Sequence, residues 1–366
     1  MLFAYLFKFN LKIVYFFLKL LPIKKNKILF LSRQSNNPSI DFILLNRELK
    51  KRNFKTVIIC KKIENGLLNY LKYYFCLYRQ MYHLATSKAC IIDSYCIPIC
   101  ILKHKKTLKI IQIWHAMAAI KQFGYQTLTK KDGRGEKIAK VMQMHNNYDF
   151  ILSGSSAMIE PFSKAFNAPL EKFIVNGLPR IDYLISNQKI LKNKIRDTYP
   201  SLKKKKNILY VPTFRKGRNI ELNQLIKKFD HKKYNLIIKV HPSTKISLND
   251  EKVLKCSKYS SLELLTIADY VITDYSAISL EAASLNIPIF LYLYDYDEYK
   301  KDNGLNIDLF KEFGKYADKN IDNIIKIINK EKYDLKVVYK FKEKYLDQDY
   351  GNYTNKLLNF IIKQME

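Results

Sequence analysis

The sequence predicts an α/β protein with two lobes, each built on a parallel sheet with crossover helices. From Lys27 onward, short apolar runs alternate with longer amphipathic segments, which is the pattern of such sheets. The 366 residues are 48% hydrophobic and 27% charged, so the chain is long enough to bury two ordinary cores. A low-complexity run, Lys203 to Lys206, separates two alternating series. We therefore expect one lobe over residues 27–200 and a second over 206–366.

Both series contain short apolar runs that we interpret as strands. In the first they are Ile28 to Leu31, Thr56 to Cys60, Ala89 to Asp93, Lys109 to Ile113, Phe150 to Leu152 and Phe173 to Val175; in the second, Asn207 to Val211, Asn235 to Val240, Tyr270 to Thr273 and Ile287 to Leu291. Helical patterns lie between several of them, notably over residues 40–51 and 155–166. The tail from Ile321 to Glu366 is expected to be wholly helical.

The first 22 residues are the most apolar part of the chain. At about 100° per residue, Lys8, Lys12 and Lys19 fall within roughly 40° of one another around a helix. One cationic stripe on an apolar helix is typical of an element that lies flat in a membrane interface. No uncharged stretch reaches the roughly 20 residues that a spanning helix needs. We predict an amphipathic membrane-associating helix over residues 1–22, with a helix docked on its own domain as the alternative.

The charge balance predicts an anionic partner. The chain has 64 Lys and Arg against 33 Asp and Glu, a formal charge of +31, and this excess must lie mostly on the surface. Nucleic acid, acidic lipid and a phosphorylated polymer all fit, because charge fixes only the sign of the partner. A Lys-rich compositional habit is the alternative. The six cysteines show no paired C-x-x-C spacing and are interpreted as reduced residues of a cytoplasmic chain.

Two histidines directly follow predicted strands, one in each lobe. His115 comes after the run that ends in Trp114, and His241 follows Val240 and precedes Pro242. Open parallel sheets bind ligands beyond the carboxyl ends of their strands, so we expect both rings to face a cleft between the lobes. A histidine in this position is suited to proton transfer. We assign no catalytic role to the other four histidines, His83, His104, His145 and His231.

Two segments of the second series are predicted to bind phosphate. Thr213 and Arg215 follow one strand and supply a hydroxyl and a guanidinium, groups that suit oxygen-rich anions. After the strand that ends at Thr273, a helix is expected to begin near Ser276, and free backbone N–H groups at a helix start hold phosphate. Ordinary capping by Asp274 or Ser276 is the alternative there. Glu281, about one turn further along, is placed to accept hydrogen bonds from ribose hydroxyls.

Several common enzyme classes are disfavoured by missing motifs. The chain has no G-x-G-x-x-G, no G-x-x-x-x-G-K-[ST], no H-E-x-x-H and no G-x-S-x-G, which argues against a dehydrogenase, P-loop ATPase, zinc protease or serine hydrolase. The D-x-D spacing occurs at Asp295 with Asp297 and at Asp347 with Asp349, but so short a pattern arises easily by chance. We predict neither a metal nor another cofactor.

The ordered set of motifs resembles the CDP-glycerol glycerophosphotransferase family, which primes and polymerises teichoic acids and related polyol-phosphate polymers. The resemblance runs from about Ile28 to the final helix. It rests on Tyr82 to Lys88, Gln112 to His115 with Lys121 and Gly124, Gly177 to Asp182, Pro212 to Arg215, His241 with Pro242, Ile272 to Ser276, and Tyr294 and Asp295 with Tyr299 and Gly304. Each piece is short, and their joint order and spacing carries the resemblance.

The resemblance implies two Rossmann-like lobes of the glycosyltransferase-B type, an N-terminal membrane-binding element, and a CDP moiety held mainly by the C-terminal lobe. It implies catalytic histidines at His115 and His241, with His115 as the base that deprotonates the acceptor hydroxyl. The implied substrate-binding residues are Lys121, Arg180, Asp182, Thr213, Arg215, Lys239, Thr273, Asp274, Ser276, Ala277 and Glu281. Of these, Thr213, Arg215 and the helix start at Ser276 would join His241 in binding the diphosphate.

The implied activity is transfer of a polyol phosphate from CDP-glycerol to a hydroxyl of a lipid-linked or growing surface polymer, with release of CMP. The enzyme would lie peripherally on the cytoplasmic face of a bacterial membrane, with an anionic membrane surface as a partner. Ala116, Ala277 and Asn303 depart from the family pattern, so a CDP-ribitol donor or a capsular polymer fits equally well. A sugar transferase of the same architecture is the first alternative. A nucleic-acid-binding protein is the second, and it is disfavoured because the chain lacks a binding motif.

Overall fold

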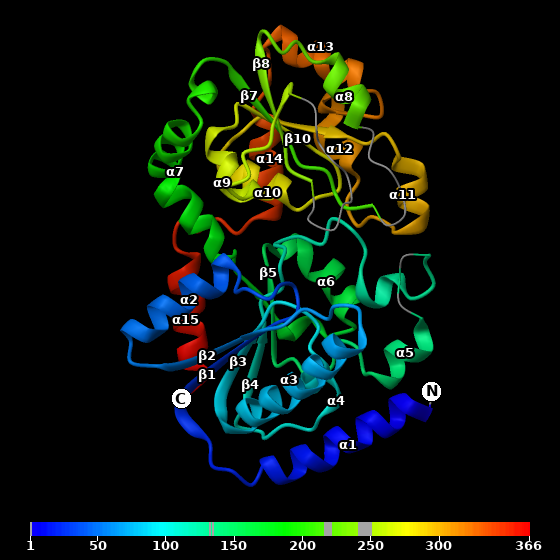
Figure 1. Cartoon of the computed structure of the whole chain (residues 1–366), viewed down its shortest axis with the longest axis vertical. Coiled ribbons are helices and arrows are strands. Elements are labelled where there is room, and N and C mark those ends of the chain that lie inside the picture. The colour runs from blue at the N-terminus through cyan, green and yellow to red at the C-terminus, as the bar shows by residue number, and fades with distance from the viewer. Residues whose placement is uncertain (1, 132, 134, 216–221, 241–250) are drawn as a thin grey trace. The chain divides into compact units, whose positions relative to one another are not determined.

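The computed structural model describes residues 2–131, 133, 135–215, 222–240 and 251–366. The chain divides into two compact units. The first unit comprises Met1–Met117, Phe123–Arg180 and Asn352–Glu366, and the second comprises Ala118–Gln122 and Ile181–Gly351. Each unit contains one six-stranded parallel sheet (Figure 1). The predicted α/β class with two parallel sheets is therefore confirmed.

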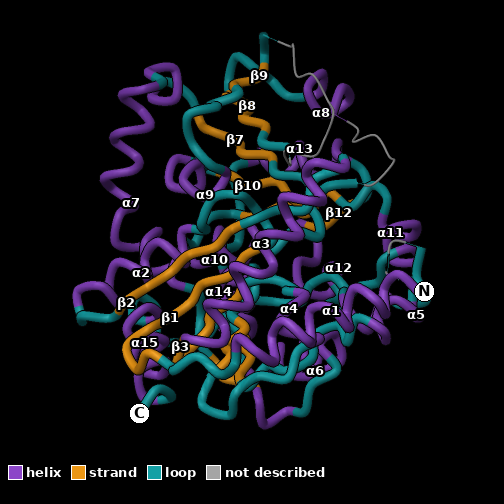
Figure 2. The backbone as a smooth tube through the Cα atoms, turned by 60° about the horizontal axis from the view of Figure 1, so that its bottom comes forward, coloured by secondary structure: helices purple, strands orange, loops and turns teal. Residues whose placement is uncertain are grey.

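The first sheet has the strand order β2-β1-β3-β4-β5-β6. Its strands are β1 (Lys24–Ser32), β2 (Lys55–Cys60), β3 (Ser87–Ile92), β4 (Lys109–Gln112), β5 (Phe150–Ser153) and β6 (Phe173–Val175). Figure 2 shows β2, β1 and β3 side by side, with Ile28 of β1 opposite Thr56 on one side and Ala89 on the other. Residues 27–32 of β1 are all buried, because helices cover both faces of a parallel sheet.

The helices of the first unit are α1 (Leu2–Leu18), α2 (Ile40–Lys51), α3 (Leu67–Thr86), α4 (Ile97–Ile101), α5 (Glu136–Val141), α6 (Ile159–Phe166) and α15 (Tyr353–Lys363). Short 3-10 turns at Gly124–Thr127, Ser156–Met158 and Leu170–Lys172 link some of them. Helix α2 begins where its sequence predicts, since the Ser39 hydroxyl accepts from the backbone N–H of Phe42 and caps the helix.

The second sheet has the strand order β12-β11-β10-β7-β8-β9. Its strands are β7 (Lys206–Tyr210), β8 (Tyr234–Ile238), β9 (Val253–Leu254), β10 (Tyr270–Thr273), β11 (Ile289–Tyr292) and β12 (Ala317–Asp318). Taken from β9, this is the 3-2-1-4-5-6 order of Rossmann folds, in which the strand order reverses between β7 and β10. In the first sheet the corresponding reversal lies between β1 and β3. Ligands bind at such points, beyond the carboxyl ends of the strands.

The helices of the second unit are α7 (Pro179–Thr198), α8 (Leu222–Lys228), α9 (Ser261–Leu264), α10 (Ile278–Ser284), α11 (Tyr296–Asp302), α12 (Leu309–Phe313), α13 (Ile321–Lys330) and α14 (Lys336–Tyr345). The first two residues of α7 still belong to the first unit. Its 3-10 turns are Pro200–Lys203, Leu265–Ile267 and Gly314–Tyr316. All ten predicted strands coincide with observed strands. Sequence inspection missed β9 and β12, because strands of two residues are too short to show a pattern.

The compact units follow different bounds from the ranges of 27–200 and 206–366 expected from the sequence. The chain passes to the second unit at residue 181, inside α7, and α15 belongs to the first unit. Tyr353 at the start of α15 is fully buried, and its backbone carbonyl accepts from Asn176 Nδ2 at 3.1 Å. A Cβ added at Gly177 would lie 2.1 Å from the Tyr353 ring, so this position requires glycine. The return of α15 thus depends on a close approach between residues far apart in the sequence.

Helix α1 is docked on the first unit and also exposes apolar side chains. Leu11 and Tyr15 are buried, the Tyr15 hydroxyl lies 2.8 Å from His104 Nδ1, and Lys8 Nζ donates to the Val141 carbonyl at 3.0 Å. The exposed large apolar residues on and just after this helix are Tyr5, Leu6, Phe9, Ile13, Phe16, Phe17 and Leu20. The docked alternative is therefore observed, while the exposed face leaves membrane association as a prediction. Among the described residues, no helix is both long and apolar enough to cross a membrane.

Candidate active site

The first candidate cluster lies at the carboxyl ends of β1, β3 and β4, next to the reversal of strand order. Ser32 ends β1, Asp93 and Ser94 directly follow β3, and His115 lies three residues beyond β4. The Ser94 hydroxyl accepts from the backbone N–H of Arg33 at 2.9 Å, which joins the β1 and β3 ends. The polar residues thus follow strands in this unit, as the sequence predicts.

His115 is exposed, and its Nδ1 has two polar neighbours. Its Nδ1 lies 3.0 Å from the Asp93 backbone carbonyl and 3.0 Å from the side-chain amide of Gln34. A carbonyl oxygen only accepts, so the bond to Asp93 requires the proton on Nδ1. The Gln34 atom at 3.0 Å from the same Nδ1 is the amide nitrogen, a donor, which suits the other tautomer. With the proton on Nδ1, the lone pair of the neutral ring resides on Nε2, which is the form a general base needs.

A left-handed backbone at Trp114 turns His115 out of the strand. Trp114 has φ of +55°, a conformation that costs free energy for a residue with a side chain. Its backbone N–H donates to Gln112 Oε1 at 2.9 Å. Its indole stacks on Phe123 at 4.7 Å and meets Phe166 edge-on at 5.1 Å between ring centroids. These contacts stabilise the turn that presents the imidazole.

Arg180 is brought to the same cluster by an ion pair that the sequence did not predict. Its Nε donates to Asp41 Oδ2 at 2.8 Å, and its backbone N–H donates to Asp41 Oδ1 at 2.8 Å. Its Nη1 lies 3.5 Å from the His115 carbonyl oxygen. Asp41 is 1% exposed, so a partner for its carboxylate is required. Asp182, two residues further on, is half-buried and falls in the second unit.

A buried carboxyl, Asp93, underlies this cluster. Asp93 is 3% exposed, and burial raises its pKa to about 6. Hydrogen bonds from Ser32 and Ser94 oppose this rise in pKa, the charge of Asp41 adds to it, and that of Arg180 opposes it. Sequence inspection counted Asp93 only as the end of a strand. An acidic residue directly after a buried strand was the signal available.

In the second unit, the ends of β7 and β10 are joined by Asp274. Both carboxylate oxygens of Asp274 accept from the backbone N–H of Thr213 at 3.0 Å. Arg215 Nη2 donates to Asp274 Oδ2 at 2.9 Å, and Arg215 Nη1 donates to the Thr213 carbonyl at 2.7 Å. The three residues were predicted for one site, and the structure brings them together at the point where the strand order reverses.

Arg215 is bound on all sides by described residues. Asp295 accepts from its Nε at 2.7 Å and from its Nη2 at 3.1 Å, and the residue is 5% exposed. The rings of Tyr275, Tyr294 and Tyr299 lie 4.9 to 5.6 Å from its Cζ. Burial opposes the charge, but the carboxylates of Asp274 and Asp295 outweigh it and raise the pKa of Arg215. This environment supports an organising role, and a direct phosphate contact stays a prediction.

The Thr213 side chain has the feature expected beside a ligand. Its Oγ1 is buried, has no hydrogen-bond partner among the described residues, and belongs to a residue that is 8% exposed. A buried hydroxyl without a partner is costly, so we expect a group outside the described residues to satisfy it. Thr273 differs, because its hydroxyl donates to the Val211 carbonyl at 2.7 Å and links the two strand ends.

Lys121 reaches this cluster from a part of the sequence that precedes the second sheet. It pairs with Leu305 in an antiparallel bridge, supported by a hydrogen bond from the Gln122 N–H to the Gly304 carbonyl at 3.0 Å. Burial lowers the pKa of Lys121, the charge of Asp274 opposes this, and that of Arg215 adds to it. Its ammonium is therefore near the Asp274 and Arg215 pair, and its role in substrate binding stays a prediction.

The remaining predicted residues of the second unit lie just before α10, within it, or after β8. Helix α10 begins at Ile278, two residues after Ser276, and Ala277 before it makes no side-chain cap. Ser276 is half-buried, and Glu281 is 3% exposed within the helix. Lys239 Nζ donates to the Cys256 carbonyl at 3.3 Å, and burial lowers its pKa. His241 lies outside the described residues.

The D-x-D pattern does not form a pair of ligands. Asp295 points to Arg215 and also accepts from the Tyr275 hydroxyl at 3.0 Å, whereas Asp297 is exposed and paired with Lys319. Within the part of the chain that the structure describes, no group of three or more His, Cys, Asp or Glu side chains is arranged to hold a metal ion.

Comparisons with known proteins agree with the fold and the motifs. The chain is 28% identical to the teichoic acid ribitol-phosphate primase of Bacillus spizizenii over 93% of this chain and 92% of that protein. It is 31% identical to the teichoic acid glycerol-phosphate primase of Bacillus subtilis over 78% and 76%. A solved structure of the wall teichoic acid polymerase TagF matches with a TM-score of 0.71 at 20% identity, covering 94% of this chain and 90% of that one.

The fold also resembles that of an enzyme named for a different reaction. The UDP-GlcNAc 2-epimerase of Methanocaldococcus jannaschii matches with a TM-score of 0.57 at 13% identity, covering 92% of this chain and 99% of that one. This likeness concerns architecture alone and fits two Rossmann-like lobes of the glycosyltransferase-B type. The model of the CDP-glycerol:poly(glycerophosphate) glycerophosphotransferase family matches residues 13–363. The chain belongs to that family of transferases.

Proposed function

We propose that this protein transfers a polyol phosphate, glycerol phosphate in the first instance, from a CDP-activated donor to a hydroxyl of a lipid-linked or growing surface polymer. The observation that carries the proposal is the state of His115. When its Nδ1 donates to the Asp93 carbonyl at 3.0 Å, its Nε2 can accept a proton. Family membership supplies the reaction class to which this base belongs.

The chemistry is an in-line displacement at phosphorus. The acceptor oxygen attacks the β-phosphorus of the donor as its proton passes to His115 Nε2, and the bond from this phosphorus to the bridging oxygen breaks. CMP leaves with the electron pair of that bond. A positioned base contributes about 10²- to 10⁴-fold to such a step. Groups that neutralise the departing phosphate contribute on the other side.

The donor is assigned to the second unit. The buried Thr213 hydroxyl, the Lys121 ammonium and the segment at Ser276 are the groups available to its phosphates, with His241 joining them from outside the described residues. Arg215 fixes the positions of Thr213 and Asp274 through its hydrogen bonds. A TagF structure with a similar fold was soaked with CDPG, which supports a CDP-linked donor for this fold.

The choice of polyol is a narrower proposal. The similar proteins of Bacillus spizizenii and Bacillus subtilis are named for ribitol phosphate and glycerol phosphate respectively, at 28% and 31% identity. The family description names CDP-glycerol. We therefore propose CDP-glycerol as the first donor and CDP-ribitol as the alternative, with a wall or capsular polymer as the product.

The location proposed is the cytoplasmic face of a bacterial membrane. Helix α1 is held on its own unit by Leu11 and Tyr15 and turns apolar side chains outward, among them Phe16 and Phe17, each more than 60% exposed. Exposed aromatic residues beside lysines suit the interface of an anionic membrane.

The test is an assay of CMP release with purified protein and membrane extract as the source of acceptor. CDP-glycerol, CDP-ribitol and a nucleotide sugar are supplied in separate reactions. We expect acceptor-dependent CMP release with one of the two CDP-polyols. Turnover of the nucleotide sugar, with both CDP-polyols left intact, would replace the proposal with the sugar-transferase alternative.

A further inference from the structure

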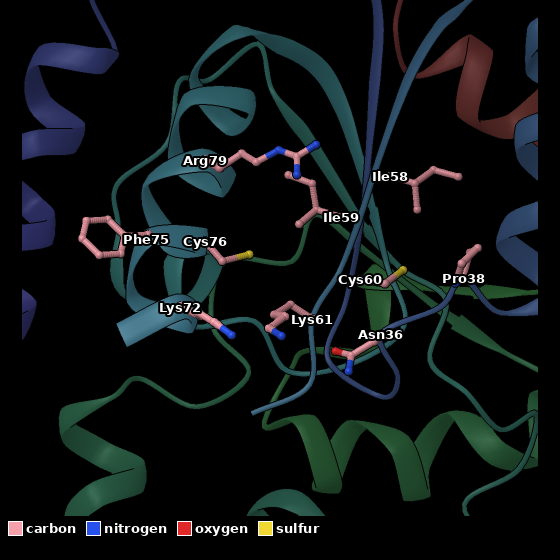
Figure 3. A pocket seen from close by; sticks show the side chains of 10 residues that line it. All are labelled: Asn36, Pro38, Ile58, Ile59, Cys60, Lys61, Lys72, Phe75, Cys76 and Arg79. Carbon is pink, nitrogen blue, oxygen red and sulfur yellow. The ribbon is translucent and has the colours of Figure 1, made fainter. Parts of the chain in front are cut away.

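A pocket in the first unit lies outside both candidate clusters and is strongly basic. It has a volume of about 550 Å³, within the usual range for small-molecule sites. It is lined by Asn36, Pro38, Ile58, Ile59, Cys60, Lys61, Lys72, Phe75, Cys76 and Arg79 (Figure 3). The lining comes from the β1–α2 loop, the end of β2 and one face of α3.

The positive charge of this pocket is not compensated by its lining. Lys61, Lys72 and Arg79 make no ion pair with a carboxylate among the described residues, and no lining residue is acidic. The two thiols stay neutral at ordinary pH. Burial raises the pKa of Cys60 to about 11, and burial also raises that of Cys76, against the hydrogen bond from Gln80 and the charges of Arg79 and Lys61. Three cations therefore face a pocket that suits a multiply charged anion.

The pocket adjoins the exposed apolar surface of the first unit. Lys72, Cys76 and Arg79 are spaced along one side of α3, and Figure 3 shows Phe75 pointing away from them. The exposed large apolar residues of α3 are Leu67, Leu68, Tyr70, Leu71, Phe75 and Tyr82, and those of α1 lie on the neighbouring helix. Helices α1 and α3 are joined through Asn10, whose Oδ1 accepts from the hydroxyls of Tyr74 and Tyr78 at 3.0 and 2.8 Å.

The pocket is also connected to His115 within the same unit. Asn36 lines the pocket, and Gln34, two residues before it, contacts His115 Nδ1 at 3.0 Å. On the other side, the charge of Asp93 contributes to the raised pKa of Cys60, and the Asp93 carbonyl binds the same imidazole. An anion in the pocket would therefore be linked to His115, the proposed base, through the short segment from Gln34 to Asn36.

We propose that this pocket binds the diphosphate of the lipid-linked acceptor, while the lipid chain stays in the membrane contacted by α1 and α3. The inference rests on the proposed function, because it takes the occupant to be the charged head of the lipid-linked acceptor. Three cations match the several charges of a diphosphate better than the single charge of a common phospholipid. The pocket then fixes one end of the acceptor and leaves its hydroxyl end to reach His115.

The experiment compares vesicle binding by the full chain. Neutral phosphatidylcholine vesicles carry either undecaprenyl diphosphate or phosphatidylglycerol at equal negative charge, and bound protein is measured by sedimentation. We expect the wild type to bind the diphosphate vesicles roughly tenfold more tightly, because several cation–phosphate contacts add together. The triple variant Lys61→Gln, Lys72→Gln, Arg79→Gln should lose this preference. Lys55→Gln, at the exposed start of β2, is the matched control and should keep it.

Two outcomes overturn the inference. One is equal binding of both vesicle types by the wild type, which would mean attraction to anionic lipid in general. The other is a diphosphate preference that survives in the triple variant. The single variant Lys72→Glu, on the exposed side of α3, tests the same point if the triple variant does not fold. CMP release and calorimetric binding of CDP-glycerol are measured in parallel, so failure of the transfer reaction is distinguished from failure of the pocket.

Discussion

The polar clusters at the strand ends of the two units differ in how exposed their charged groups are. In the first unit an exposed imidazole stands above a buried carboxyl whose pKa is raised to about 6. In the second, the guanidinium of Arg215, a residue that is 5% exposed, is enclosed by two carboxylates and three tyrosine rings. A group that exchanges protons must reach its substrate and titrate near neutral pH, whereas a group that fixes loop ends must stay charged. The contrast fits the proposal that the first unit transfers the proton and the second binds the donor.

The largest effect, on the rate of transfer, is expected when the exposed imidazole of His115 is removed. His115→Ala should lower kcat for polyol-phosphate transfer by about 10²- to 10⁴-fold, because it removes the proposed base. Binding of the CDP donor, measured by calorimetry, should stay nearly unchanged, since the second unit is untouched. His231→Ala, in the second unit at a residue without an assigned role, is the control. Equal turnover by wild type and the His115 variant would refute the base assignment.

Loss of the enclosed guanidinium of Arg215 should lower both the stability of the protein and its affinity for the donor. Arg215→Ala leaves Asp274 and Asp295 buried without their cation, so the free energy of unfolding should fall by about 3–5 kcal/mol. Urea denaturation measures this loss. The affinity for the donor should fall more than kcat does, because Thr213 loses the partner of its carbonyl. Lys344→Ala removes an exposed pair with Glu312 and should cost less than about 1 kcal/mol. Equal losses in the two variants would contradict the buried network.

The buried carboxyl of the first unit predicts a pH dependence. The folded pKa of Asp93 is about 6, against 3.8 for the ordinary group. Between these values the folded state holds more protons than the unfolded state, so the free energy of unfolding falls as pH rises from about 4 to about 6. Asp93→Asn cannot titrate and should lack this decline. Urea midpoints across that range measure the difference, and parallel curves for both proteins would argue against a raised pKa.

The apolar face of α1 distinguishes the first unit in a second respect. Phe16→Gln with Phe17→Gln should weaken binding to anionic vesicles severalfold, since each ring is more than 60% exposed and contributes apolar area to an interface. Thermal stability should change little, because neither ring is buried in the unit. Unchanged vesicle binding would shift the membrane contact to the basic surface elsewhere.

The smallest effect is expected at Asp297. Its carboxylate is exposed and paired with Lys319, so Asp297→Asn should change stability by less than about 1 kcal/mol and leave kcat within about twofold. Asp295→Asn, two residues before it, should be far more damaging because it reaches Arg215. A large loss of activity in the Asp297 variant, restored by added divalent metal, would revive the D-x-D motif as a metal site.

The sequence by itself determined the α/β class, ten strands of two parallel sheets, and the family. These features follow from local patterns, since apolar periodicity and residues placed directly after strands are visible without coordinates. It also placed His115, Thr213, Arg215 and Asp274 beyond strand ends, where open parallel sheets bind ligands. Their roles in catalysis and binding stay predictions.

The tertiary structure decided which polar groups meet. Asp41 pairs with Arg180, 139 residues away, and Asp295 pairs with Arg215, 80 residues away. No local pattern marks such partners, because burial of a charge selects whatever opposite charge the fold brings near. The same holds for α15, which returns to the first unit through the close approach of Gly177 and Tyr353. Periodicity identifies an element, but only packing selects the surface on which that element is buried.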